Sequence, residues 1–242
     1  MLSQSLKLAL RDGLIGRNPC EGLVLPKRQR HELSFYTEEQ VERLFAAVRE
    51  EQIYPVIYFS AMYGLRRSEL LGLQWDSVDF QAKTFTVRRT VVQNKTIAEK
   101  EKTKNAPSRR TLPLMPQAIS MLQSMKKQER ENRRLFGRDY HENQYIFKWP
   151  DGKLYIPHYI SEKFPKLLAQ YGLPHIRLHD LRHSCASLLL TMEGVTMKDV
   201  QEWLGHANIS MTADIYGHLD MARKSLIGNG IAERFSHSGA KC

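Results

Sequence analysis

Apolar residues recur along most of this chain at intervals of three and four, the spacing of a helix with one buried face. This pattern predicts helices over residues 1–13, 37–47, 53–63, 116–134 and 157–171, then from His179 onward and from Thr196 to Gly205. Thr37 and Gln40 form a capping box at the start of one helix, and Gly64 suits a left-handed cap at the end of another. Pro165 is expected to interrupt the helix at 157–171.

The spacing changes after Asp79, where β-prone residues run from Thr84 to Val92 and return over residues 109–114. Between these runs, residues 100–104 read Lys-Glu-Lys-Thr-Lys and are predicted to form a basic loop. A second short hairpin is predicted near residues 145–152. We therefore expect a small antiparallel sheet beside a mainly helical core.

The charge balance points to a polyanionic partner. The chain of 242 residues has 36 lysines and arginines against 26 aspartates and glutamates, which gives a formal net charge of +10. Its three cysteines are far apart and form no Cys-x-x-Cys pair, which favours a reducing, cytoplasmic setting over a disulfide framework. No apolar run approaches the length that crosses a bilayer.

Two arginines are candidates for binding a phosphate. His179 and Arg182 are three positions apart, so a helix projects them from one face, while the apolar residues that follow supply the opposite, core-facing side. Arg182 would offer a planar fork of donors and His179 a titratable donor. Arg66 is expected in a tight turn between two buried helices, although a surface ion pair with Glu69 would explain that residue alone.

Four motifs, taken together and in this order, resemble the boxes of the tyrosine recombinases, most closely the integrases of phages and conjugative transposons. They are residues 64–69 (Gly-Leu-Arg-Arg-Ser-Glu), 179–182 (His-Asp-Leu-Arg), 204–206 (Leu-Gly-His) and Tyr216. The resemblance begins near residue 34. It implies an α+β, mainly α-helical catalytic domain with a small antiparallel edge sheet, which cleaves and rejoins DNA.

The resemblance also implies a set of catalytic residues, namely Arg66, Lys102, His179, Arg182, His206 and Tyr216. In this set Tyr216 is the nucleophile and Glu69 supports Arg66. Lys102 is the best match for the lysine in the sheet loop, but the connection that follows is longer than is typical, so Lys104 stays an alternative. Contacts to DNA are expected from Arg67, Lys104, Arg109 and Arg110.

The implied chemistry needs neither metal nor cofactor. Attack by a tyrosine oxygen on a phosphodiester builds negative charge that two guanidinium groups and imidazole donors can stabilise. A 3′-phosphotyrosyl bond then conserves the bond energy for rejoining. The partners implied are double-stranded DNA and further copies of the chain, which is expected to be a monomer without DNA and a homotetramer on paired DNA sites.

Three segments are expected along the chain. Residues 1–31 resemble the last helix and linker of the family's N-terminal core-binding domain, so we expect the remnant of an upstream domain there. Residues 32–219 would form the catalytic domain. Residues 220–242 would be a C-terminal tail, with apolar residues at helical spacing that need a groove in which to bury.

Three other functions fit part of the sequence. His179 and His183 have the spacing of a zinc hydrolase motif, with Asp180 in the place of the acid and Glu202 as a third ligand. This reading leaves Arg66, the basic loop and Tyr216 without a role. A type IB topoisomerase shares the recombinase chemistry, but the spacing favours a recombinase. A DNA-binding module without activity would not need every catalytic residue.

Overall fold

The computed structural model describes residues 2–23, 34–93, 97–101 and 109–205. The chain divides into two compact units, residues 1–32 and 33–242. The first contains α1 (Leu2–Arg11), which agrees with the helix predicted at this end and buries none of its residues. Among the described residues, no helix is long and apolar enough to span a membrane.

The second unit holds the remaining helices, most of them where the sequence predicts them. They are α2 (Glu38–Ala47), α3 (Tyr54–Tyr63), α4 (Arg67–Leu71), α5 (Pro116–Phe136), α6 (Pro157–Gln170), α7 (Asp180–Thr191) and α8 (Met197–Leu204), with short 3-10 turns at Trp75–Ser77 and Gly137–Asp139. The capping box is confirmed, since Thr37 N donates to Gln40 Oε1 at 2.9 Å and Thr37 Oγ1 accepts from Gln40 N at 3.3 Å.

The strands form two small antiparallel sheets. β1 (Val78–Asp79), β2 (Thr84–Val87) and β5 (Arg110–Pro113) pair in the order β1-β2-β5, and β3 (Arg89–Gln93) pairs with β4 (Ile97–Glu101). The run predicted from Thr84 to Val92 is therefore broken at Arg88, because its halves have different pairing partners. The predicted loop is also wrong at its start, since Lys100 and Glu101 belong to β4.

Two further predictions need correction. Helix α6 runs without interruption through Pro165, because Ile160, Phe164 and Leu167 bury its apolar face in the core and outweigh the lost backbone hydrogen bond. The hairpin predicted at 145–152 is shorter and lies later in the chain: an antiparallel bridge joins Lys148 to Leu154, and Gly152 N donates to Trp149 O at 2.9 Å in the turn between them, while Tyr145 instead pairs with Gln74.

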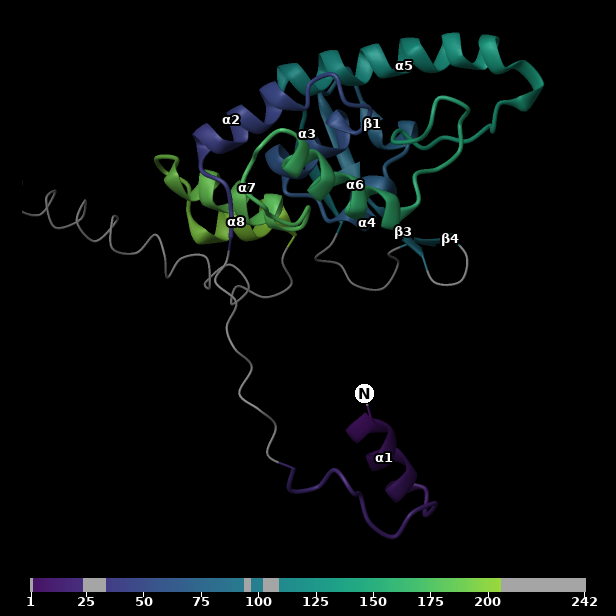
Figure 1. Ribbon diagram of the computed structural model, residues 1–242, viewed down its shortest axis with the longest axis vertical. Coiled ribbons are helices and arrows are strands. Elements are labelled where there is room, and N and C mark those ends of the chain that lie inside the picture. The colour runs from purple at the N-terminus through teal and green to yellow at the C-terminus, as the bar shows by residue number, and fades with distance from the viewer. Residues whose placement is uncertain (1, 24–33, 94–96, 102–108, 206–242) are drawn as a thin grey trace, which may run out of the picture. The chain divides into compact units, whose positions relative to one another are not determined.

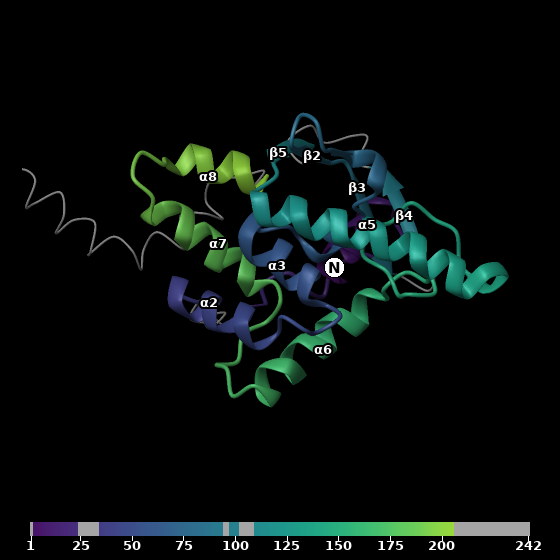
Figure 2. The same cartoon turned by 90° about the horizontal axis from the view of Figure 1, so that it is seen from above.

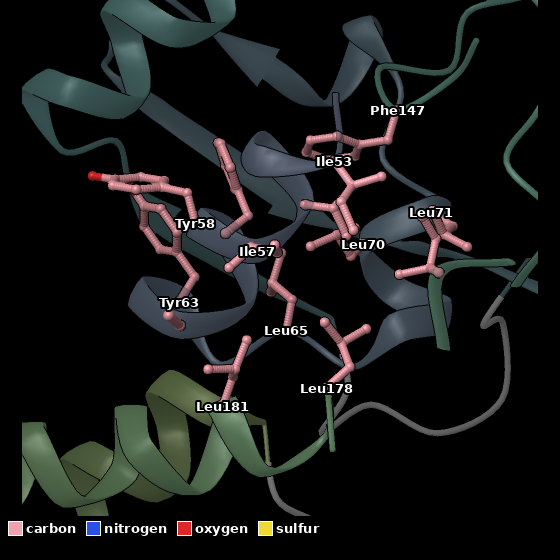
Figure 3. Close-up of a cluster of buried hydrophobic side chains, with 14 of the residues drawn as sticks. Ile53, Ile57, Tyr58, Tyr63, Leu65, Leu70, Leu71, Phe147, Leu178 and Leu181 are labelled. Carbon is pink, nitrogen blue, oxygen red and sulfur yellow. The ribbon is translucent and has the colours of Figure 1, made fainter. Parts of the chain in front are cut away.

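The core is centred on α3, which is apolar on nearly all sides. Both views place α3 in the interior of the unit, with α2, α5 and α7 around it (Figure 1 and Figure 2). The aromatic rings of Phe59, Tyr63, Phe85 and Phe147 pack with centroids 5.0–6.0 Å apart. Figure 3 shows Leu181 of α7 directed into the cluster that α3 and α4 supply. This packing fixes α4 and α7 relative to each other.

Gly64 joins α3 to α4 and allows α8 to approach. It has φ of +60°, and its amide donates to Ser60 O, so the predicted left-handed cap is confirmed. A Cβ at this position would lie 2.3 Å from Leu204 Cδ2 and 3.3 Å from Cys185 Sγ. Glycine is therefore required here by backbone conformation and by the contact with α7 and α8.

We predict that Gly64→Ala lowers the free energy of unfolding by about 2–4 kcal/mol, as the left-handed strain and the overpacking add. Gly172→Ala is the matched control, because Gly172 has φ of +63° and a Cβ there would meet nothing within 4 Å. The control should lose only about 1 kcal/mol. Urea denaturation of both variants measures the difference, and equal losses would contradict the packing argument.

Candidate active site

The predicted cationic residues meet where α4 and α7 begin and α8 ends. Figure 1 shows these three helices on the side of the unit opposite α5. Arg66 is the residue before α4, and its Nη1 donates to Glu69 Oε1 at 2.8 Å while its backbone amide donates to Glu69 Oε2 at 3.1 Å. The pairing of Arg66 with Glu69 is thus present, but the carboxylate is fully buried rather than on the surface. Glu69 therefore holds Arg66 from its buried side.

Arg182 is more buried than the sequence suggests. Only 2% of the residue is exposed, so α7 does not present it on an open face, which corrects the prediction. Its Nη1 donates to Gly64 O, and its Nη2 donates to Leu204 O at 2.7 Å. Burial, followed by the proximity of Arg66, lowers the pKa of Arg182 to about 9, which leaves the guanidinium charged at neutral pH.

Arg110 joins the same cluster from β5, although the sequence analysis grouped it with the residues expected to contact DNA. Its Nη2 donates to Glu69 Oε2 at 3.2 Å and its Nε donates to Trp203 O at 2.7 Å. The residue is buried and has these protein partners, and its expected contact with DNA stays a prediction. The alternation of β5 could have revealed this, because Arg110 shares its buried face with Leu112.

Three successive carbonyls at the end of α8 each accept a hydrogen bond from a different arginine. Trp203 O is bound by Arg110, Leu204 O by Arg182, and Gly205 O by Arg66, whose Nη1 and Nη2 both lie 3.3 Å away. The last carbonyls of a helix lack partners within the helix and carry partial negative charge. The arginines therefore hold this helix end, and residue 206 follows it directly.

Two histidines at the start of α7 have lowered pKa values, His179 just before the helix and His183 within it. The rings of His179 and His183 lie 5.4 Å apart and nearly perpendicular. Burial lowers the pKa of both, and the charge of Arg182 lowers it further. Burial alone would raise the pKa of the neighbouring Asp180, but hydrogen bonds from Arg177 lower it. At neutral pH both imidazoles are therefore in the neutral form, the form that a general base must have before it takes a proton.

A recess opens in front of Arg66 and His179. It is lined by Arg66, Arg67, Ser68, Ser161, Pro165, Arg177, Leu178 and His179. The Arg66 side chain is 28% exposed, so its guanidinium reaches this space while Glu69 holds its other side. Cationic groups around an open recess suit a phosphate group.

The model of the phage integrase family matches residues 34–223. The chain belongs to the phage integrase family. It is 31% identical over 237 residues to a XerC-like tyrosine recombinase of Caldanaerobacter subterraneus, covering 90% of this chain and 60% of that protein. It is 27% identical to the ICEBs1 integrase of Bacillus subtilis, covering 90% of this chain and 59% of that protein. The chain thus spans about 60% of the length of these relatives.

Solved structures agree on the fold. The Tn1549 transposon integrase in complex with transposon right end DNA aligns with a TM-score of 0.75 at 21% identity, over 93% of this chain and 75% of that chain. The XerA recombinase aligns with a TM-score of 0.58 at 24% identity, over 88% of this chain and 68% of that chain. The α+β, mainly helical fold with a small antiparallel sheet is confirmed, and the topoisomerase alternative is not favoured.

The structure brings together only part of the predicted catalytic set. Arg66, His179 and Arg182 meet with Glu69, whereas the remaining predictions lie outside the described residues: Lys102, Lys104, His206 and Tyr216. Arg67 and Arg109 are exposed, and Arg67 donates to Ser161 Oγ. These assignments stay predictions.

The zinc alternative gains no support from the described residues. No three histidine, cysteine, aspartate or glutamate side chains among them gather into a group that could hold a metal ion, so Glu202 does not join His179 and His183. Arg182, which lies between those histidines in sequence, is directed to backbone carbonyls.

The lowered histidine pKa values predict acid sensitivity in the window just below pH 6.5. There the unfolded chain takes up protons that folded His179 and His183 resist, so the free energy of unfolding should fall by up to about 1.4 kcal/mol per pH unit for each histidine. Urea denaturation between pH 7 and pH 5 measures this slope. His183→Gln should flatten it, and an unchanged slope in that variant would contradict the prediction.

Proposed function

We propose that this chain is the catalytic part of a site-specific DNA recombinase that cleaves and rejoins DNA through a 3′-phosphotyrosine intermediate. The observation that carries the proposal is the cluster of Arg66, Arg110 and Arg182 around Glu69 at the end of α8, beside His179, in a member of the phage integrase family. Relatives named as tyrosine recombinases and integrases support it.

A phosphodiester would sit in the recess beside Arg66 and His179. Its non-bridging oxygens gain charge during attack, and guanidinium groups that are already fixed stabilise that charge without rearranging. Arg66 reaches the recess directly. Arg182 is 2% exposed, and its hydrogen bonds to the carbonyls of Gly64 and Leu204 fix the orientation of the guanidinium plane.

Two proton transfers accompany the strand cleavage. The Tyr216 hydroxyl attacks phosphorus and passes its proton to neutral His179, while the leaving 5′ oxygen takes a proton from Lys102, or from Lys104 as the alternative. His206 follows the fixed end of α8 and would donate to a phosphate oxygen. The phosphotyrosyl bond retains the energy needed for rejoining, so neither metal nor cofactor enters the reaction.

The partner of the proposed recombinase is double-stranded DNA. The net charge of +10 supports this, as do the solved structures of relatives bound to DNA, among them a lambda integrase dimer bound to a core site. We further propose a monomer without DNA, a homotetramer on paired DNA sites, and action in the cytoplasm. Residues 1–31 would be the end of a core-binding domain, and the tail at 220–242 would dock between protomers.

Tyr216→Phe should abolish covalent attachment to DNA, because the change removes the attacking hydroxyl and little volume. The substrate is a nicked half-site from the junction of the element that carries this gene, so that cleavage traps the protein. The matched control is Tyr171→Phe, which removes the hydroxyl of an exposed tyrosine bonded to Glu51. Denaturing electrophoresis detects the adduct. A heat-stable adduct with the Tyr216 variant would reject this nucleophile.

The general acid can be identified with a substrate whose bridging 5′ oxygen is replaced by sulfur, a leaving group that needs no proton. We expect Lys102→Ala to cleave ordinary DNA slowly, by about 100-fold or more, and the sulfur substrate at nearly the wild-type rate. Lys104→Ala should show no such rescue. Rescue of Lys104→Ala alone would exchange the two roles.

A further inference from the structure

The hydrogen-bond partners of Arg110 are groups that hold the site together, and not groups that are expected to react. Like Arg182, Arg110 is buried and does not line the recess, but it also binds Glu69, the carboxylate that holds Arg66. We propose that Arg110 is a positioning residue for DNA cleavage, which holds both the carboxylate that aligns Arg66 and the helix end that leads to residue 206. This assignment rests on the proposed recombinase function.

The first link runs through Glu69. This carboxylate is fully buried, with Oε1 bound by Arg66 Nη1 at 2.8 Å and Oε2 bound by Arg110 Nη2 at 3.2 Å. Each oxygen thus faces a different guanidinium. Oε2 also accepts from the Arg66 backbone amide at 3.1 Å. Without Arg110, the carboxylate would keep its hydrogen bonds to Arg66 but lose the one that ties it to β5, so Glu69 and Arg66 together would be held less firmly beside the recess.

The second link runs through the last turn of α8. Arg110 Nε donates to Trp203 O at 2.7 Å, and the guanidinium lies against Gly205, where a Cβ would be only 2.7 Å from Nη1 and 3.2 Å from Cζ. Gly205 has φ of +67°, so its backbone turns out of the helix at this contact. Arg110 therefore sets the point from which the chain continues to His206.

The third link is the place of Arg110 in the chain. β5 begins at Arg110, and the segment that contains Lys102 and Lys104 comes shortly before it in the sequence. The buried side chain ties the start of this strand to α4 and α8. Arg110 thus fixes three features: the start of β5, the Glu69 carboxylate that holds Arg66, and the end of α8.

The loss of an ion pair with only a structural role should lower stability without slowing cleavage. The chain contains one such pair for comparison. Lys148 Nζ lies 2.9 Å from Glu129 Oε1, with side chains 6% and 10% exposed, and the hydrogen-bond partners of this pair among the described residues are Trp75, Arg133 and Asn143, which lie outside the arginine cluster. Lys148→Ala therefore leaves a buried carboxylate short of a cation, as Arg110→Ala does, without touching the site.

The test measures covalent adduct formation on the nicked half-site at saturating DNA, together with DNA affinity. We expect Arg110→Ala to form the adduct at least about tenfold more slowly than wild type, because small misplacements of reacting groups slow cleavage strongly. Its DNA affinity should stay within a few-fold of wild type. Lys148→Ala should cleave at the wild-type rate.

Chemical rescue separates positioning from stability. Free guanidinium ion, at a concentration far below that which unfolds proteins, should restore part of the rate of Arg110→Ala by filling the vacated site, and an equal concentration of sodium chloride should not. Arg110→Lys keeps a cation for Glu69 but cannot bind Trp203 O with a planar fork. We therefore expect it to fold and to cleave slowly.

Two results would overturn the assignment. One is a wild-type cleavage rate in Arg110→Lys or Arg110→Ala. The other is a loss that guanidinium does not restore and that Lys148→Ala reproduces, since this would show a stability effect alone. Absence of any adduct with the wild-type chain would instead overturn the proposed function, and the assignment with it.

Discussion

The site depends on one buried carboxylate. Glu69 lies between Arg66 and Arg110, and within the described residues it is the acidic side chain that these two guanidiniums share. A buried ion pair need not add net stability, because removing charges from water opposes the attraction between them. The ion pairs instead fix positions. The carboxylate keeps the two positively charged guanidinium groups close together although they repel each other. The ion pair of Glu69 with Arg110 also links α4 to the start of β5.

The carbonyl oxygens at the end of α8 offset the remaining positive charge of the cluster. Its carbonyls accept from Arg66, Arg110 and Arg182, so three elements that are distant in sequence are joined at one helix terminus. The approach is possible because Gly64 and Gly205 both have left-handed backbones without a Cβ. The two glycines therefore belong to the site as much as the arginines do, since they allow the close contacts that hold the guanidiniums in place.

Local signals in the sequence predicted local features well. The capping box at Thr37 and the left-handed turn at Gly64 depend on neighbouring residues, and both were predicted correctly. The alternation of β5 indicates that Arg110 points inward, but its partners and the carbonyl partners of Arg182 are 22 to 118 positions away, and no short pattern encodes them. Pro165 shows the same limit, because burial of its helix outweighed the local preference to break there.

The cluster holds more positive than negative charge, and folding stability alone does not account for this excess. Burial and the nearby Arg66 lower the pKa of Arg182, so the folded chain holds that cation against an opposing free energy. An anion bound in the recess would attract both guanidiniums and relieve this opposition. By linkage, groups whose charges are held unfavourably in the folded chain then bind a phosphate more tightly. Because Glu69 and the α8 carbonyls fix them beforehand, little of that binding energy is spent on ordering side chains.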